Sequence, residues 1–407
     1  MEIDRDVLVK YLDEIAACGA LPDGGCWRPL YSKAWAEVRH KISGWMEDAG
    51  LQVRDDAVGN LWGRVSGHHS GKAVVTGSHM DTVRRGGRLD GALGVVAGLV
   101  AVRALIECYG KPKRPIEVLA TCEEEGSRFA TNFWGARAVV GTIAADEAQT
   151  VADADGVTLA QAMAEHDLDP AAIPSAARDD LAAFVELHIE QGGVLETSGR
   201  RIGVVTTIVG GKYLRITVKG RPDHAGTTPM GMREDALVAA AMMVQDVEAV
   251  ASDMGAPAVA TVGQLTIEPF QANVVPGKVS FTIDLRHADA TFLDRLAQRL
   301  AESARRIAAS RGLIVEVEET HTRPPVDMDD EVISALESAA QDNGSEASLM
   351  VSGAGHDAQI LASACPAGML FVPSIGGRSH CPEEDTDTED LVLGANVLAS
   401  GLKKLAY

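Results

Sequence analysis

The sequence lacks the paired cysteines on which many small metal and redox sites depend. Its 6 cysteines are scattered over 407 residues, and no two of them form a CxxC pair. This spacing argues against a zinc ribbon or a thioredoxin-type site and is typical of a reduced cytoplasm. Cys122 and Cys381 lie beside candidate ligands in the sequence, and we expect both to be small buried fillers.

Positive charge is also scarce. The chain has 37 Lys and Arg against 58 Asp and Glu, a formal net charge of -21. This excess argues against nucleic acid or an anionic membrane as a partner, although a local cation still permits an anionic small substrate.

The acidic, amphipathic N-terminus has no signal-peptide pattern, and no apolar run is expected to span a bilayer. We expect a cytoplasmic protein.

Several common catalytic signatures are absent. The chain contains no Walker A sequence and no HExxH, and the glycines between Gly86 and Gly98 do not form a dinucleotide fingerprint. Ser374, in VPSIGG, lacks the preceding glycine of a nucleophile elbow. None of these signatures therefore competes for the function of the chain.

One stretch does carry candidate metal-site residues. The apolar run Ala73–Val75 predicts a buried strand, and Ala92–Val102 has helical spacing. Between them lie His79, Asp81 and Asp90, at a strand end, where open α/β sheets build their sites. His79 can bind a divalent cation while Asp81 holds its other ring nitrogen, and Asp90 has two oxygens that can bridge two metals. In the alternative interpretation, His79 is only a hydrogen-bonded histidine and Asp90 a helix N-cap.

A second predicted strand ends in a run of carboxylates. The strand Pro115–Thr121 leads into Glu123, Glu124 and Glu125. Three adjacent carboxylates repel one another unless a cation lies among them. One of them can then be a metal ligand and its neighbour a general base that reaches the same water. The alternative is a solvated acidic turn.

Two more strand ends present histidines. His188 lies in FVELHIEQG, at the end of a predicted strand, and His380 follows a strand and a glycine turn in FVPSIGGRSH. With His79, one aspartate and one glutamate, these histidines supply five ligands. That number suits two ions that share Asp90.

The order of the predicted elements divides the chain into two domains, as its length suggests. A βαβ unit, and hence a parallel sheet, is predicted from strand Ala73–Gly77, helix Ala92–Cys108 and strand Pro115–Thr121. A later segment predicts a β-α-β-β-α-β unit of the ferredoxin-like type with one polar sheet face, its first helix spanning Arg233–Ala251. We predict an α/β catalytic domain with a mostly parallel sheet (1–210 and 325–407) and an inserted α+β lid (211–324).

Eight motifs in order resemble those of the M20-type metallo-amidohydrolases of the hydantoinase/carbamoylase branch. They are GSHMDT…GGRLDG, EEEGSRF, ELHIEQG, HAGTTPM, QANVVPG, IDLRH, SGAGHDA and VPSIGGRSH. This branch contains allantoate amidohydrolases, N-carbamoyl-L-amino acid hydrolases and β-ureidopropionases. The resemblance runs from about Gly24 to the C-terminus, and GGCWRPLYS, EEEGSRF followed by FWG, and SGAGHDAQI look most like allantoate amidohydrolases.

This resemblance implies a role for each candidate residue. One divalent ion, zinc or manganese, would be held by His79, Asp90 and His188. A second would be held by Asp90, Glu125 and His380. Glu124 would be the general base, and Asp81 would hold the ring of His79. The substrate-binding positions of the family fall on Gln191, His224, Asn273, Arg286 and Gly353.

The resemblance also implies a reaction and an assembly. The expected activity is hydrolysis of a ureido C–N bond in a carboxylate-bearing substrate, with allantoate first and an N-carbamoyl-L-amino acid or β-ureido acid as the alternative. An aminoacylase or dipeptidase and a non-catalytic binding relative stay open as further alternatives. Arg286 would clamp the carboxylate, and His224 would stabilise the oxyanion. The expected assembly is a homodimer through the lid, in which His224 reaches the neighbour's metals.

Some features depart from the family pattern or have an ordinary explanation. Gly193 stands where many relatives have proline, and Arg378 adds a cation next to His380. Arg286 can instead be a surface arginine on an edge strand, and His224 a loop histidine.

Overall fold

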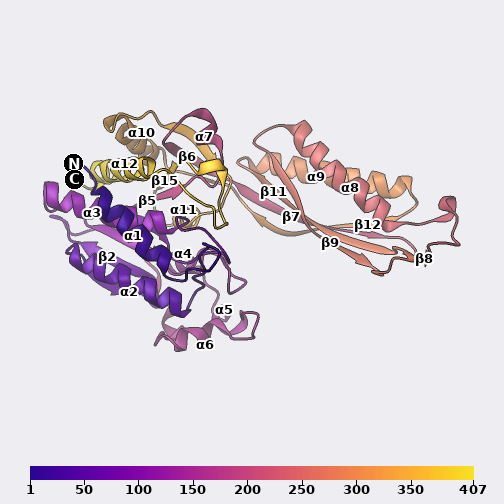
Figure 1. Cartoon of the computed structure of the whole chain (residues 1–407), viewed down its shortest axis with the longest axis horizontal. Helices are drawn as coiled ribbons and strands as arrows, with labels where there is room; N and C mark the ends of the chain where they lie inside the picture. The colour runs from indigo at the N-terminus through magenta and orange to yellow at the C-terminus, as the bar shows by residue number, and fades with distance from the viewer. The chain divides into compact units, whose positions relative to one another are not determined.

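The computed structural model describes all 407 residues, which form two compact units. The first unit combines Met1–Thr206 with Met328–Tyr407, and the second is Thr207–Asp327. These limits lie within a few residues of the limits expected for the catalytic domain and the lid. Figure 1 labels the helices and strands of both units.

A mixed sheet forms the centre of the first unit. Its strands are β1 (Gln52–Asp55), β2 (Leu61–Val65), β3 (Ala73–His79), β4 (Ile116–Thr121), β5 (Leu181–Ile189), β6 (Gly203–Ile208), β14 (Ser348–Ser352) and β15 (Ala367–Val372). The strand order is β1-β2-β4-β3-β5-β15-β6, and β14 also pairs with β6. The pairs β4–β3, β3–β5 and β5–β15 are parallel, while the flanking pairs are antiparallel. A short strand, β13 (Val326–Asp327), pairs with the end of β6 where the chain returns from the second unit. The predicted fold class is confirmed.

The strand order determines where a site can form. The chain runs from β3 to β4 on one side, and β5 then pairs with β3 on the other side. The order therefore reverses between β3 and β5, and open α/β sheets bind ligands outside the carboxyl ends of the strands at such a point. The carboxyl ends of β3, β5, β4 and β15 carry or precede all the candidate metal ligands.

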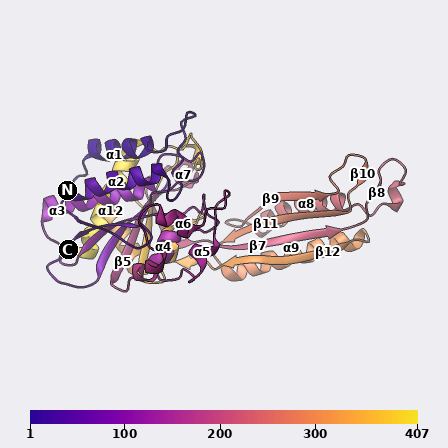
Figure 2. The ribbon, with the colours of Figure 1, turned by 90° about the horizontal axis from the view of Figure 1, so that it is seen from below.

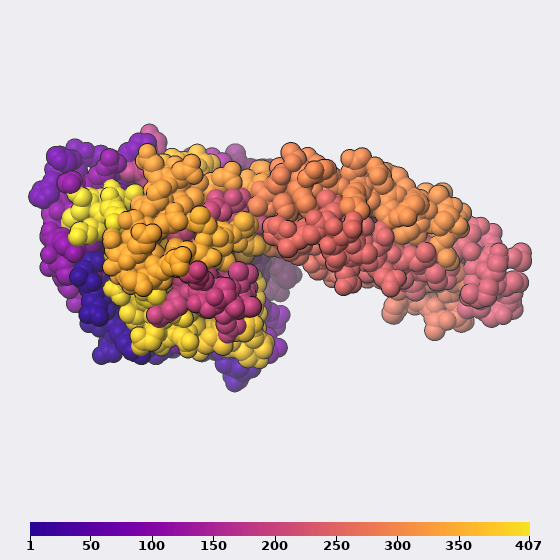
Figure 3. All heavy atoms as spheres, turned by 90° about the horizontal axis from the view of Figure 1, so that it is seen from above, coloured from indigo at the N-terminus to yellow at the C-terminus, as the bar shows by residue number.

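Helices surround this sheet (Figures 1 and 2). They are α1 (Arg5–Ala17), α2 (Lys33–Asp48), α3 (Ala92–Tyr109), α4 (Trp134–Val139), α5 (Glu147–Thr150), α6 (Leu159–Ala164), α7 (Val194–Ser198), α10 (Asp330–Asp342), α11 (Asp357–Leu361) and α12 (Thr388–Ala406), with short 3-10 helices η1 (Pro170–Ala176) and η3 (Ile375–Gly377). Helix α3 packs against β3, α1 and α12, and α11 packs against β5 and β15. The space-filling view shows α10, in orange, beside the yellow C-terminal segment (Figure 3).

Helix α3 corrects one expectation. By length and composition alone, Ala92–Tyr109 is long and apolar enough to cross a membrane, although no such run was expected. However, 67% of this stretch is buried inside the protein, and the core helix of a globular protein passes the same test. The apolar part of the helix, Ala92–Val102, is buried on all sides by the sheet and by neighbouring helices.

The second unit is a four-stranded antiparallel sheet with two helices. Its elements are β7 (Gly210–Lys219), β8 (Asp223–His224), η2 (Met230–Met232), α8 (Ala236–Met254), β9 (Val259–Glu268), β10 (Val274–Val275), β11 (Lys278–His287), α9 (Ala290–Ser310) and β12 (Ile314–Arg323). The strand order is β12-β7-β11-β9, and β8 pairs only with β10. This is the predicted β-α-β-β-α-β order, and Figure 2 shows α8 and α9 along the sheet.

Side-chain periodicity explains this unit. Buried and partly buried residues alternate along β11, so that one sheet face packs on the helices and the other stays more accessible. In α9 the buried residues recur at intervals of three and four, as Leu293, Leu296, Leu300, Ala304 and Ile307. These residues join those of α8 and the sheet in one core cluster.

The start of helix α8 was predicted three residues too early. Helix α8 starts at Ala236 and not at Arg233, because the Asp235 side chain accepts hydrogen bonds from the backbone N–H groups of Leu237 (3.0 Å) and Val238 (3.1 Å). Strands β6 and β14 were not predicted at all. Both flank the parallel strands and lack a distinctive alternation.

We expect Asp235→Ala to destabilise the second unit by about 1 kcal/mol, because two N–H groups of α8 lose their acceptor. Glu248→Ala, an exposed position on the same helix, is the matched control and should change stability much less. Urea unfolding with hydrogen exchange of the α8 amides measures both. If the two substitutions changed stability equally, the Asp235 cap would not explain why α8 starts at Ala236.

Candidate metal centre

Three histidines converge on the carboxylate of Asp90. His79 Nε2 and His188 Nε2 lie 3.5 Å and 3.1 Å from Asp90 Oδ1, and His380 Nε2 lies 3.1 Å from Asp90 Oδ2. Burial raises the pKa of Asp90, but the hydrogen bonds from the three histidines outweigh this effect and hold that pKa well below its ordinary value. Asp90 is therefore a buried anion with one oxygen directed to each side.

The alternative interpretation of Asp90 as a helix N-cap is wrong. The residue at the N-cap of α3 is Gly91, which makes no side-chain capping bond. Gly91 has a φ of 66°, and a Cβ atom there would lie 2.4 Å from ring atoms of His79. Only glycine lets the chain turn this close to the imidazole and bring Asp90 to it.

Two of the groups of potential ligands share Asp90. One is His79, Asp90 and His188, and the other is Asp90, Glu125 and His380, and within each group the ligand atoms lie within 4.8 Å of one another. Both groups contain imidazole and carboxylate donors, which suit zinc and manganese. Asp90 and Glu125 raise the pKa of His380 to about 10, so without metal a proton takes the place of the cation. The residues present therefore fit two divalent ions.

The side chain of Asp81 ties two strand ends together. Its Oδ1 lies 3.3 Å from His79 Nδ1 and also accepts the backbone N–H of Glu124 (3.0 Å), while Oδ2 accepts the N–H of Glu125 (3.2 Å). Asp81 is fully buried. Its contact with His79 was predicted from the sequence, but its hold on the glutamate turn was not.

The run of three glutamates is not a solvated acidic turn. Glu123 and Glu124 are buried, and Glu125 is nearly so. Burial, followed by the charge of Glu125, raises the pKa of Glu124 well above its ordinary value. Burial and the charge of Asp81 do the same for Glu123. Glu124 is thus a carboxylate of raised basicity next to the two ligand groups, the state that a general base requires.

A further layer of buried polar residues lies beneath His188. The ring of His356 meets that of His188 edge to face at 4.5 Å, and its Nε2 lies 3.0 Å from Ser352 Oγ. Asp357 bonds to Thr121, and burial with the charge of Glu186 raises the pKa of Asp357 to about 8.

Sequence reasoning missed these residues, although their motifs, ELHIEQG and SGAGHDA, were noted. Glu186, His188 and His356 even form a further group whose ligand atoms lie within 4.8 Å of one another. The sequence did contain a signal for Glu186. Residues two positions apart on a strand lie on the same face, and Glu186 precedes His188 by two residues.

Residues 75–404 match the Peptidase family M20/M25/M40. The chain belongs to this family. It is 41% identical over 404 residues to the allantoate amidohydrolase of Bacillus subtilis (strain 168), covering 99% of this chain and 98% of that one. It is 43% identical over 384 residues to the N-carbamoyl-L-amino-acid amidohydrolase of Paenarthrobacter aurescens, covering 94% and 93%.

Solved structures agree. The hydantoinase/carbamoylase family amidase from Burkholderia multivorans matches with a TM-score of 0.93 and 37% identity, covering 100% of this chain and 98% of that one. The predicted resemblance is confirmed, and so is the predicted class of enzyme, an amidohydrolase of the M20 family.

Among the predicted substrate residues of the first unit, Gln191 reaches the candidate centre. Its Nε2 lies 3.1 Å from Asp90 Oδ2 and 3.3 Å from His380 Nε2, and its φ of 59° is unusual for a residue other than glycine. Gly353 lies in an exposed loop between β14 and α11. Arg378 is exposed and pairs with Glu383 at 2.9 Å.

The predicted lid residues lie at two ends of the second unit. Arg286 pairs with Asp284 at 2.9 Å, near the end of β11 that pairs with Gly211. Its strand lies between β7 and β9, so the alternative of an edge-strand arginine is wrong. His224 is exposed in β8, where its Nδ1 accepts the N–H of Gly226 (3.0 Å).

Asn273 lies beside His224, since its carbonyl oxygen accepts the N–H of Ala225 at 3.0 Å. These two residues lie beyond the opposite end of β11, next to Lys278. Eight strand residues at about 3.3 Å each separate Lys278 from Arg286, so about 26 Å lies between the two ends.

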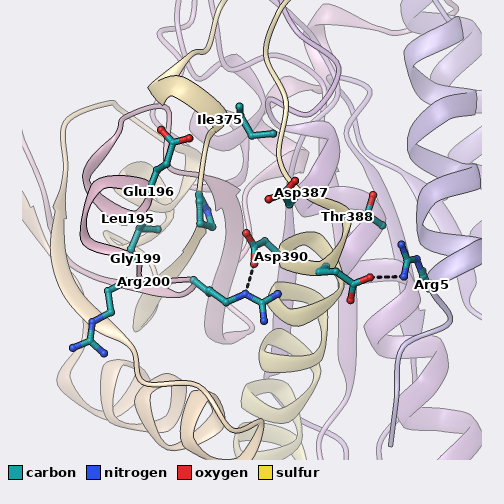
Figure 4. A pocket seen from close by; sticks show the side chains of 12 residues that line it. Arg5, Leu195, Glu196, Gly199, Arg200, Ile375, Asp387, Thr388 and Asp390 are labelled. Carbon is teal, nitrogen blue, oxygen red and sulfur yellow. Dashed lines mark hydrogen bonds and ion pairs between the residues drawn. The ribbon is translucent and has the colours of Figure 1, made fainter.

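Two other features of the first unit take no part in the centre. A pocket of about 700 Å³ lies beside α7 and the start of α12, and it contains none of the predicted site residues (Figure 4). Its charges compensate one another, because Arg201 pairs with Asp390 and Arg5 with Glu389.

Cys122 is buried as expected, whereas Cys381 is partly exposed, so the expectation of a buried filler was wrong there.

We expect the three neighbouring glutamates to differ on substitution by Gln. Glu125→Gln should lower the metal content of the purified protein, because one donor group loses its carboxylate. Glu124→Gln should keep the metal but lower kcat by roughly 10²–10⁴-fold, as for a lost general base. Glu123→Gln is the matched control, since this buried neighbour belongs to none of the groups of potential ligands. Elemental analysis and initial rates measure these effects, and the opposite pattern for Glu124 and Glu125 would exchange their roles.

Proposed function

We propose that this enzyme hydrolyses the ureido C–N bond of allantoate and releases ammonia and carbon dioxide. The observation that carries the proposal is the Asp90 carboxylate, shared by two ligand groups next to the buried Glu124. Its similarity to an allantoate amidohydrolase supports the choice of substrate. N-carbamoyl-L-amino acids are the second candidate, because a relative named for them is 43% identical.

The chemistry of the bond explains why such a centre is needed. A ureido carbon is a poor electrophile, because both nitrogen atoms donate into the carbonyl group. Two divalent ions, zinc or manganese, held by His79, Asp90, Glu125, His188 and His380, supply a water of lowered pKa and a Lewis acid when bound. The protein must supply the proton transfer and the orientation of the substrate.

Glu124 performs the proton transfer. Its raised pKa lets it accept a proton from the attacking water at its carboxylate and deliver it to the leaving nitrogen. Asp81 keeps Glu124 in place through the backbone N–H of that residue. Gln191, next to Asp90 and His380, is placed to hold the polar end of a bound substrate.

Arg286 binds the substrate carboxylate. A guanidinium group matches a carboxylate with two parallel hydrogen bonds and so fixes the orientation of the ureido group. Its pairing with Asp284 fixes the plane of the guanidinium in advance. Asn273 and His224 bind at the other end of the substrate, where His224 stabilises the oxyanion.

These assignments require a second subunit. Arg286 lies at one end of β11 and His224 beyond the other end, with about 26 Å of strand between the two ends. A single lid therefore cannot present both residues to one small substrate. The enzyme is therefore a homodimer through the second unit, in which each active site takes His224 and Asn273 from the neighbour. In a two-fold dimer each site lends and receives the same residues.

A substrate panel tests the proposed reaction. With the ions restored after chelation, ammonia release should be fastest from allantoate, slower from N-carbamoyl-L-amino acids and absent after chelation alone. N-acetyl amino acids and dipeptides, followed by amine release, are the control for the aminoacylase and dipeptidase alternatives. Higher kcat/KM on those compounds, or full activity of the chelated protein, would contradict the proposal.

Subunit mixing tests the dimer. Glu124→Gln and His224→Ala should each be nearly inactive. After subunit exchange, mixed dimers contain one site with both groups intact, so about one quarter of wild-type activity should return. Exchange is followed with two affinity tags. No recovery in mixed dimers would place His224 in the site of its own chain or outside catalysis.

A further inference from the structure

Glu384 has no assigned role in the reaction, yet it is buried beside the centre. It lies between His380 and the start of α12, and its side chain is 2% exposed. Neither ligand group contains it. A buried carboxylate in this place needs an explanation, because the charge of Asp90 opposes its own.

The explanation lies in four hydrogen bonds to two separate segments. Oε1 accepts the backbone N–H groups of Leu89 (2.9 Å) and Asp90 (3.0 Å). Oε2 accepts the hydroxyl of Ser379 (2.7 Å) and the backbone N–H of His380 (3.3 Å). One carboxylate thus joins the loop of the shared ligand to the loop of the His380 ligand.

The neighbouring glycine supports this function. A Cβ atom at Gly87 would lie 2.1 Å from Glu384 Cδ and 2.4 Å from its Cβ, so the GGRLDG loop must have glycine there to admit the side chain. The two loops differ from the other ligand positions. His79 and His188 lie within strands β3 and β5, which hold them through sheet hydrogen bonds, whereas Asp90 and His380 lie on irregular chain.

We propose that Glu384 is a positioning residue that sets the separation of Asp90 and His380 and thereby the affinity of the Asp90–Glu125–His380 group for its metal ion. This inference rests on the proposed two-ion centre. Removal of this carboxylate should lower the metal affinity of the two groups unequally. The group that contains His380 depends on both loops, whereas the group with His79 and His188 depends only on the loop of Asp90.

The test is metal binding by the metal-free protein. Glu384→Gln keeps the shape, but its amide NH₂ must face N–H or O–H donors on one side. Titration with Zn²⁺ against a chromophoric chelator should show two ions in the wild type. In the variant, the affinity of the Asp90–Glu125–His380 group for its ion should fall about 10–100-fold. The affinity of the group with His79 and His188 should change less. Glu383→Gln, which alters an exposed neighbour paired with Arg378, is the matched control and should bind both ions normally.

A second variant guards against a failure to fold. Gly87→Ala leaves Glu384 in the chain but displaces its side chain, so it should show the same selective loss. Melting of the metal-free proteins is recorded in parallel, because a role in folding alone would lower the melting temperature without changing the ratio of the two affinities. Unchanged affinity for both ions in the folded variants would overturn the inference. A wild type that binds no ion would instead overturn the two-ion centre.

Discussion

The structure depends on negative charge brought together at one end of a parallel sheet. Asp81, Asp90, Glu124 and Glu125 lie close together out of water, where like charges repel strongly. The three histidines around Asp90 offset part of this charge, and two divalent ions would offset the rest. This explains why the centre combines raised and lowered pKa values. Burial and the charge of Glu125 outweigh the effect of His79 on the pKa of Glu124, whereas hydrogen bonds from three histidines outweigh the effect of burial on the pKa of Asp90.

Carboxylates hold the irregular segments around this charge as well. Asp81 accepts N–H groups from the glutamate turn, and Glu384 accepts N–H groups from the loops of Asp90 and His380. Backbone N–H groups stabilise an anion without adding a competing ligand. The carboxylates that hold the loops and the candidate metal ligands are therefore the same chemical group in different surroundings.

The second unit serves a different need. Its antiparallel sheet is stiff along the strands, so that residues at opposite ends stay about 26 Å apart. Arg286 at one end and His224 with Asn273 at the other cannot meet on one small molecule within a chain. This rigidity is the reason that the proposed function assigns His224 and Asn273 to the neighbouring subunit of a dimer.

The elements and the residue types of the centre could be predicted from the sequence. Apolar runs predicted the parallel strands, helical spacing predicted α3, and the order of strands and helices predicted the second unit. Histidines or acids at four strand ends indicated the candidate two-ion site, because local patterns report burial. Features that depend on packing between distant segments became visible only in the fold. It showed that Asp90 is not a helix cap, that β11 is an inner strand, that Asp81 also holds the glutamate turn, and that His356 and Glu384 are buried beside the centre. Such roles arise when residues hundreds of positions apart, such as Leu89 and Glu384, meet through hydrogen bonds that no local pattern records.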